Sequence, residues 1–118
     1  MIIGIGIDIV EIKRIRETIE RQGEAFLKKI FCDEEIAYAK RSSDPSKHYA
    51  ARFAAKEAVF KALGSKPYVA WKKIRIINDE NGKPCCDYLE NDFPHNIMIS
   101  LSHTEDYAVA NAIITQKS

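Results

Sequence analysis

Isoleucine recurs at every second position near the start of the chain, which is the spacing of a β-strand over Met1–Val10. The alternate isoleucines share one face of this strand: Ile3, Ile5, Ile7 and Ile9. The other face carries Gly4, Gly6 and Asp8. Because glycine weakens a strand, two glycines on one face indicate that another part of the molecule approaches the backbone closely there.

Three segments have the apolar spacing and the end signals of helices. The first is expected over Glu11–Gln22 and stops at Gly23. A short helix should follow Asp33, whose side chain can cap it. A long helix should run from about Ser46 to Leu63 and end at a glycine, Gly64.

The second half of the chain has the pattern of β-strands. An apolar, β-branched segment over Trp71–Asp79 is followed by the turn signal Asn81-Gly82 and a weak strand over Lys83–Tyr88. A second pair of strands, Ile97–His103 and Tyr107–Thr115, should form a C-terminal hairpin. Early helices and late antiparallel strands predict an α+β fold, with an antiparallel β-sheet packed against the long helix.

The length and charge of the chain limit what it can be. Its 118 residues match one domain of ~100–150 residues, and no linker divides the chain, so a single domain over residues 1–118 is expected. Apolar residues make up 46% and charged residues 30%, which argues against disorder. The charge sum of 18 − 17 = +1 gives no sign of nucleic-acid binding.

The cysteines and the apolar start of the chain bear on its location. The cysteines are odd in number, and Cys85 and Cys86 are neighbours that cannot bridge without strain. Met1–Val10 is too short to span a bilayer and carries Asp8. We therefore expect a reduced cytoplasmic protein that does not contact a membrane.

One acid on the long helix stands in an apolar setting. At about 100° per residue, Glu57 falls beside Phe53 and Phe60, on the face expected to be buried. A lone carboxylate there costs several kcal/mol unless it is paired or bound to a metal. Lys61, one turn further on, offers a purely structural alternative, an i,i+4 pair with Glu57 worth ~0.3–0.5 kcal/mol.

Asp8 is a second acid in an apolar segment, on the glycine face of the first strand. It could simply cap the helix that follows. Alternatively, Asp8 and Glu57 could hold a magnesium ion, since magnesium takes one or two carboxylates together with water and substrate phosphate oxygens. Lys61 would then lie close to those phosphates.

Two further features have both a structural and a functional interpretation. His103 ends a strand at the mouth of the hairpin, where it can be a hydrogen-bonded turn residue, a general base or a phosphate contact. The first helix carries basic residues that can form a solvated face or dock an acidic protein: Lys13, Arg14, Arg16 and Arg21.

The order of three motifs adds a family resemblance. They are Ile3–Ile15 (IGIGIDIVEIKRI), Arg52–Lys61 (RFAAKEAVFK) and Ser100–Ala110 (SLSHTEDYAVA). Together, and in this order, they resemble the signatures of the 4′-phosphopantetheinyl transferases, in particular the small bacterial holo-[acyl-carrier-protein] synthases. The resemblance spans essentially the whole chain.

The resemblance implies a 4′-phosphopantetheinyl transferase-like fold and a reaction in fatty acid biosynthesis. The 4′-phosphopantetheine group would move from coenzyme A to a serine of apo-acyl carrier protein, and adenosine 3′,5′-bisphosphate would leave. It also implies a magnesium cofactor, acyl carrier protein as partner, and a homotrimer whose active sites are shared between neighbouring subunits.

The resemblance assigns roles by motif position. Asp8 and Glu57 would bind magnesium, and Glu57, Lys61 and His103 would be catalytic. Coenzyme A contacts are implied at eight positions: Arg52, Lys56, Lys61, Gly64, Pro84, Ser102, His103 and Thr104. Arg14 and Arg21 lie on the helix that would recognise the carrier protein. The segment Gly64–Pro67 departs from the family, which often has a second glycine after Gly64.

Several questions stay open at this point. The base for the serine hydroxyl could be Glu57, a metal-bound water or His103. Paired acids and magnesium also suit a nuclease-like phosphodiesterase, although the near-neutral charge and the lack of further clustered acids weigh against it. A non-catalytic module that binds an acidic protein would use the basic first helix alone, and it would leave Asp8 and Glu57 unexplained.

Overall fold

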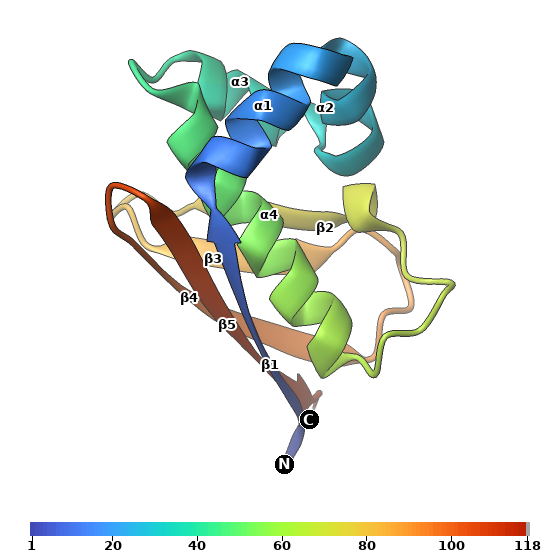
Figure 1. Cartoon of the computed structure of the whole chain (residues 1–118). Coiled ribbons are helices and arrows are strands. Elements are labelled where there is room, and N and C mark those ends of the chain that lie inside the picture. Colours follow the sequence, from blue (N-terminus) through green and yellow to red (C-terminus); the bar gives the residue numbers. More distant parts are fainter. Residues whose placement is uncertain (118) are drawn as a thin grey trace.

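The computed structural model describes residues 1–117 and places an N-terminal strand, four helices and four further strands along the chain (Figure 1). The elements are β1 (Ile2–Glu11), α1 (Ile12–Gln22), α2 (Glu24–Ile30), α3 (Asp33–Lys40), α4 (Pro45–Ala62), the 3₁₀ turn η1 (Trp71–Lys73), β2 (Ile74–Asn78), β3 (Pro84–Tyr88), β4 (His95–His103) and β5 (Tyr107–Gln116). The α+β prediction is confirmed.

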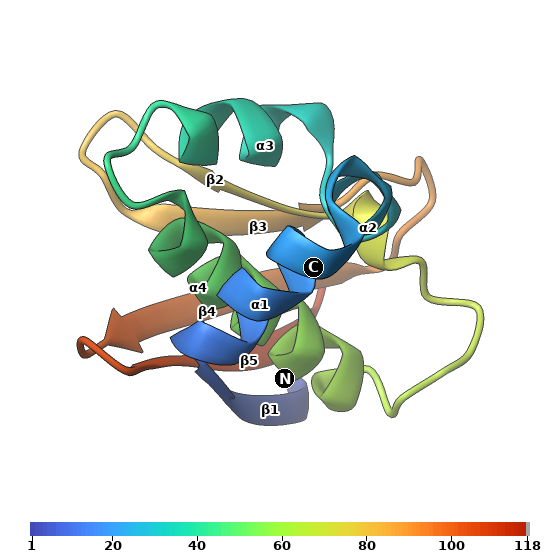
Figure 2. The same ribbon diagram turned by 45° about the horizontal axis from the view of Figure 1, so that its top comes forward.

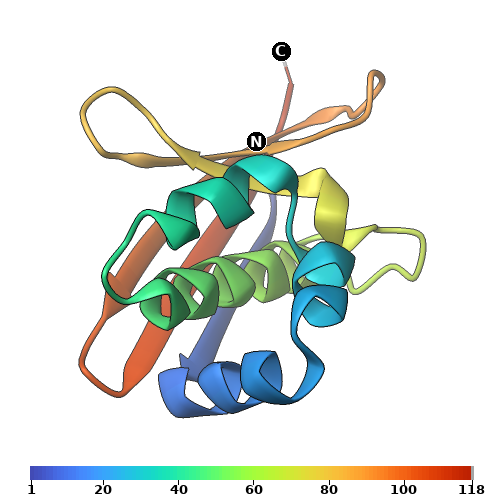
Figure 3. The same cartoon turned by 90° about the horizontal axis from the view of Figure 1, so that it is seen from above.

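The strands form two antiparallel sheets. The larger has the order β1-β5-β4, so the first and last strands of the chain are neighbours, and the smaller pairs β2 with β3. Gln116 N donates to Met1 O at 3.1 Å, which brings the two ends of the chain together (Figure 1). Helix α4 runs across the larger sheet between α1 and α3 (Figure 3), and α3 lies beside β2 (Figure 2).

Three differences from the sequence prediction concern the helices and the start of β2. Helix α2 is an addition to it: the chain breaks at Gly23 (φ +59°) and then resumes as a helix. The N-cap of α3 is Cys32 rather than Asp33, and the Glu35 carboxylate accepts the Cys32 N–H at 2.8 Å. The strand expected from Trp71 begins at Ile74, since its first three residues form η1.

Where α4 packs on the larger sheet, the core is built on small residues of the helix rather than on Phe53 and Phe60. The prediction that Phe53 and Phe60 mark the buried face is wrong, because both are only partly buried. The helix residues with no exposed area are mainly alanines, and they pack against alanines of β5: Ala54, Ala55 and Ala58 against Ala110 and Ala112. Within residues 1–117, none of the helices combines the length and hydrophobicity that a bilayer crossing requires.

The two glycines of β1 lie against the backbone of α4, so the predicted close approach to this face of the strand is confirmed. A Cβ at position 6 would overlap the carbonyl oxygen of Ala58 and lie 2.9 Å from Ala62 N. A Cβ at Gly4 would overlap the carbonyl oxygen of Ala62. Helix and sheet can therefore be this close only because both positions lack a side chain.

We accordingly expect Gly6→Ala to destabilise the fold, because a helix backbone cannot move aside as a flexible side chain can. Overpacking of this kind costs about 1–3 kcal/mol or more, equivalent to a fall in Tm of roughly 5 °C or more in a domain of this size. Thermal unfolding followed by circular dichroism measures it. Ile2→Ala, at a 61% exposed position of the same strand, is the control. An unchanged Tm for Gly6→Ala would contradict the close packing.

The outer face of the larger sheet carries apolar residues that residues 1–117 leave uncovered. Ile5, Ile7 and Ile9 of β1 are 73%, 65% and 63% exposed, and Met98 of β4 is 55% exposed. Their neighbours across β5 include Val109 and Ile113. These apolar residues lie beside the exposed polar residues Ser100, Ser102 and Asn111, and an exposed apolar patch with polar neighbours is typical of a protein–protein interface.

The three cysteines are free thiols. Cys32 is buried, Cys85 is exposed, and burial raises the pKa of the Cys86 thiol to about 12. The adjacent pair therefore forms no bridge, in line with the sequence prediction.

Candidate active site

Asp8 and Glu57 line one hollow of about 310 Å³. Asp8 lies on the helix-facing side of β1, paired with the buried residue Ala110, and Glu57 lies in the middle of α4. Arg14 of α1 and Phe53 of α4 line the same hollow. The fold thus brings together two acids that are 49 residues apart in sequence (57 − 8 = 49).

The electrostatics of this hollow favour a bound cation. Burial raises the pKa of Glu57, and the negative charge of Asp8 raises it further, while Lys61 lowers it. The Asp8 side chain is 15% exposed, so water screens this repulsion only in part. A positive ion near both carboxylates would relieve the repulsion between them.

Lys61 pairs with Asp8 across the helix–strand contact. Its Nζ lies 3.0 Å from Asp8 Oδ1 and donates to Ile7 O at 3.2 Å, while its side chain stays 49% exposed. This ion pair replaces the proposed Glu57–Lys61 pair. The capping alternative for Asp8 is also wrong, because the N-cap of α1 is Glu11 and no side chain caps that helix.

The donor set of the hollow fits magnesium better than a metal held by protein ligands alone. Residues 1–117 contain no group of three or more histidine, cysteine, aspartate or glutamate side chains that could hold a metal ion. Magnesium commonly takes one or two carboxylates and completes its shell with water and phosphate oxygens. Asp8 and Glu57 are such a pair, and the hollow leaves space beside them.

The end of α4 adds a tight turn close to Lys61. Gly64 has φ +83°, and its N–H donates to Lys61 O at 3.0 Å. Ser65 has φ +54°, in the left-handed region that favours glycine. The serine therefore adopts the backbone conformation for which a second glycine, frequent in the resembled family, would be suited.

Comparison with known proteins shows the family to which this chain belongs. Residues 4–112 match the model of the 4′-phosphopantetheinyl transferase superfamily. The chain belongs to this superfamily. A holo-[acyl-carrier-protein] synthase of Chlorobaculum tepidum is 48% identical over 111 residues, which cover 92% of this chain and 95% of that protein.

Solved structures agree with this assignment. A holo-[acyl-carrier-protein] synthase of Neisseria meningitidis is 35% identical and superposes with a TM-score of 0.88, over 98% of this chain and 100% of that one. One of Bacillus anthracis, in complex with coenzyme A (3′,5′-ADP), is 34% identical with a TM-score of 0.86, and 99% of each chain is covered. The resemblance inferred from the motifs is confirmed.

Several residues assigned to coenzyme A in this transferase lie outside the Asp8–Glu57 hollow. His103 is exposed at the end of β4 and pairs with Ala108 of β5. Thr104 Oγ1 accepts the N–H groups of Asp106 and Tyr107, which shapes the hairpin turn after Ser102 and His103. Pro84 begins β3, in the smaller sheet. None of these residues lines the hollow of the paired acids.

Arg52 lines a different groove, of about 630 Å³, between α3, α4 and β2. Its Nη2 donates to Asn78 Oδ1 at 2.7 Å, and its guanidinium lies 4.4 Å from the centre of the Tyr38 ring. Arg41 lines the same groove. Within residues 1–117, Arg52 Nε is buried without a hydrogen-bond partner.

Lys56, expected at the coenzyme, is instead completely buried. Its Nζ lies 2.9 Å from Glu35 Oε1 and donates to the carbonyl oxygens of Trp71, at 2.9 Å, and Ile74. Glu35 also accepts the Ile76 N–H at 2.8 Å. The ammonium therefore joins α3, η1 and β2 to α4 and is not available to a ligand. From the sequence, Glu35 resembled an ordinary acid in the first turn of a helix.

The two arginines assigned to carrier recognition are exposed on α1, at different distances from the acids. Arg14 lines the Asp8–Glu57 hollow itself, whereas Arg21 lies in the last turn of the helix. The basic face of α1 therefore extends from Arg14, at the hollow, to Arg21, at the end of the helix.

Proposed function

We propose that this chain transfers 4′-phosphopantetheine from coenzyme A to a serine of apo-acyl carrier protein in fatty acid biosynthesis. The products are holo-acyl carrier protein and adenosine 3′,5′-bisphosphate. The observation that carries the proposal is the hollow lined by both Asp8 and Glu57, with Lys61 paired to Asp8, in a chain of this superfamily. That membership disfavours the nuclease and the non-catalytic module.

In this reaction the serine oxygen displaces adenosine 3′,5′-bisphosphate at phosphorus, so positioning and charge neutralisation supply most of the catalysis. Magnesium, held by Asp8 and Glu57, would supply neutralisation of the pyrophosphate. Lys61 offers an exposed ammonium to the leaving phosphate as charge builds there. Glu57, which lines the hollow, is one candidate general base for the serine proton. His103 of a neighbouring subunit is another candidate base.

We further propose a homotrimer of this single domain, acting in the cytoplasm. The exposed isoleucines of β1 supply an apolar surface for contact between subunits. Each active site would combine Asp8, Glu57, Lys61 and Gly64 of one subunit with residues of its neighbour. Those are Arg52, Pro84, Ser102, His103 and Thr104, which lie away from the acids in their own chain. Lys56 is left out because its ammonium is buried against Glu35.

The proposal is tested by incubating the protein with coenzyme A, magnesium and apo-acyl carrier protein and weighing the carrier by mass spectrometry. The expected result is a gain of one phosphopantetheine group, with none on a carrier whose acceptor serine is alanine. Degradation of an added oligonucleotide would support the nuclease instead. Binding of the carrier without a mass gain would support the non-catalytic module.

For carrier docking, we expect Arg14→Glu with Arg21→Glu to raise the KM for carrier protein severalfold or more and to leave the KM for coenzyme A nearly unchanged. Acyl carrier proteins are acidic, and exposed charge pairs contribute ~0.2–1 kcal/mol each and are screened by salt. Steady-state kinetics at two ionic strengths measure the effect. Lys72→Glu with Lys83→Glu, two exposed positions away from α1, is the matched control. An equal loss of affinity for both substrates would point to disruption of α1.

A further inference from the structure

The buried ion pair of Lys56 and Glu35 has no part in the chemistry at the Asp8–Glu57 hollow. Both side chains are completely enclosed, and Lys56 Nζ lies 2.9 Å from Glu35 Oε1. Replacing such a pair by apolar residues often leaves stability unchanged or raises it, because the desolvation of two charges offsets their attraction. In some proteins, buried polar groups are retained because they select one arrangement of the elements that they join. What this pair does therefore depends on the elements that it joins.

The pair joins the strand β2 to helix α4 through directional hydrogen bonds. From α4, Lys56 Nζ donates to the carbonyl oxygens of Trp71, in η1, and Ile74, the first residue of β2. From α3, Glu35 Oε2 accepts the N–H of Ile76, in the middle of β2, at 2.8 Å. Bonds to two residues of one short strand fix both its distance from α4 and its position along the helix.

The apolar contacts of the smaller sheet do not fix that position. Within residues 1–117, neither β2 nor β3 is paired with a strand of the larger sheet. Ile74 and Ile76 are buried in the core together with Val59 of α4, but apolar contact is not directional. Such contact holds the strand against the helix and tolerates sliding along it.

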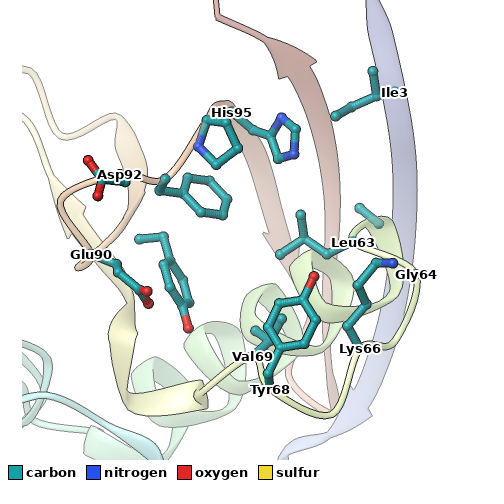
Figure 4. A pocket seen from close by; sticks show the side chains of 13 residues that line it. Ile3, Leu63, Gly64, Lys66, Tyr68, Val69, Glu90, Asp92 and His95 are labelled. Carbon is teal, nitrogen blue, oxygen red and sulfur yellow. The ribbon is translucent and has the colours of Figure 1, made fainter.

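Open space lies along α4 on both sides of this attachment. On the N-terminal side is the groove of Arg52, between α3, α4 and β2. On the C-terminal side, a hollow of about 440 Å³ separates the end of α4, at Leu63, from the loop between β3 and β4, which carries Glu90 (Figure 4). Because packing beside the ion pair is interrupted on both sides, its hydrogen bonds carry more of the attachment.

The position of β2 decides where residues assigned to coenzyme A lie. Asn78 follows Ile76 by two residues, and its Oδ1 accepts Arg52 Nη2 at 2.7 Å. Asn78 pairs with Pro84 of β3. The proposed function places Arg52 and Pro84 at coenzyme A, the first on α4 and the second on the smaller sheet. A shift of β2 along α4 would therefore move Pro84 relative to Arg52 and break the hydrogen bond to Asn78.

We propose that the Lys56–Glu35 pair positions the smaller sheet for binding of coenzyme A. It holds β2 and β3 at the place along α4 where Arg52, Asn78 and Pro84 form one surface for the nucleotide. The inference rests on the proposed function. Both side chains are enclosed and act through other residues, so they are positioning residues. Their loss weakens binding of coenzyme A more than it slows transfer by the saturated enzyme.

The main test uses the double variant Lys56→Met with Glu35→Gln, which removes both buried charges and nearly conserves side-chain volume. No ion is left unpaired in the core, so the chain should fold, but the hydrogen bonds from α4 to Trp71 and Ile74 are lost. The KM for coenzyme A should rise at least ~5-fold, the scale of a lost hydrogen bond, with kcat and the KM for carrier protein within about twofold. A merely structural pair would change the amount of folded enzyme, and thus the apparent kcat, without changing the KM for coenzyme A.

A matched control weakens the core elsewhere. Ile114→Val shortens a completely buried side chain of β5 and should lower Tm while leaving the KM for coenzyme A unchanged. Calorimetry with adenosine 3′,5′-bisphosphate alone probes the nucleotide surface without the transfer step. The double variant should bind this nucleotide at least ~5-fold more weakly than the wild type, and Ile114→Val should bind it as tightly as the wild type.

A measurement on the wild type covers the case in which the double variant does not fold. Hydrogen–deuterium exchange followed by mass spectrometry compares the free protein with its complex with adenosine 3′,5′-bisphosphate. A nucleotide that bridges α4 and the smaller sheet should slow exchange in β2 by a larger factor than exchange in β5. Unchanged exchange in β2 would overturn the inference.

The outcomes separate this inference from the function on which it rests. If the wild type modifies the carrier and a folded double variant keeps its KM for coenzyme A, the positioning role is overturned and the proposed function stands. An equal loss of affinity for coenzyme A and carrier protein would also overturn the positioning role, because the effect would not be confined to the nucleotide. No transfer by the wild type would count against the proposed function itself.

Discussion

Asp8→Asn and Glu57→Gln should each lower phosphopantetheine transfer by at least ~100-fold, the scale of losing a charge-stabilising group in a preorganised site. Each substitution keeps the shape of the side chain and removes one of the two negative charges that would hold magnesium. The rate at saturating substrates, measured over a range of magnesium concentrations, shows the loss. Added magnesium should restore part of it, because the remaining carboxylate still binds the ion weakly.

The same substitutions should leave the fold intact. Glu57 is partly buried and repelled by Asp8, so neutralising either acid removes an unfavourable interaction in the absence of metal. We expect Tm without magnesium to stay the same or to rise for Glu57→Gln, and to change little for Asp8→Asn, which also weakens the ion pair with the half-exposed Lys61. Glu17→Gln, at an exposed position of α1, is the control for loss of an acid. Near-normal transfer at low magnesium by either variant would contradict its assignment as a ligand.

If the proposed trimer forms through the isoleucines of β1, Ile5→Asp should convert it to a monomer and abolish transfer. Ile5 is 73% exposed in the single chain, so a charge there is harmless to the monomer but unfavourable in an apolar interface. Size-exclusion chromatography with light scattering measures the mass of the particle. Leu89→Asp, at an exposed apolar position outside the larger sheet, should leave both mass and activity unchanged.

A mixing experiment tests whether neighbouring subunits share a site. Glu57→Gln and His103→Ala chains should each be inactive as homotrimers. Refolded together, they should regain part of the activity, because some sites then combine an intact Glu57 with an intact His103 from the neighbour. A fully active trimer of Ile5→Asp would show that the isoleucine face is not the interface. No recovery on mixing would indicate that each active site takes its Glu57 and its His103 from one and the same chain.

Much of the local structure follows from the sequence alone. The period-2 isoleucines mark β1, and Gly23 and Gly64 end α1 and α4 near the expected positions. The glycines of β1 revealed a close neighbour because only the lack of a side chain permits that contact. Spacing could not reveal α2 or the short turn η1, where tertiary packing outweighs weak local preferences.

For the candidate site, too, the sequence predicted one part and the tertiary structure was needed for the other. The sequence identified Asp8, Glu57 and Lys61 as residues of unusual chemistry, and the order of the motifs indicated the family. That the two acids face one hollow, and that Lys61 pairs with Asp8 instead of Glu57, depends on how β1 docks on α4. The spacing of residues along a helix predicts which side chains are neighbours on that helix. It does not predict which residues of another helix or strand they contact.

The sequence did not predict correctly which side chains are buried, and the reason is physical. Lys56 and Glu35 carry charges that normally point to solvent, yet they are fully buried, because they pair with each other and with backbone groups of three elements. The isoleucines of β1, which a hydrophobic pattern would bury, are exposed in the single chain because α4 covers the glycine face. The sequence determined the elements and the chemistry of their side chains. Only the tertiary structure decided which faces meet, since that depends on the shapes of surfaces far apart along the chain.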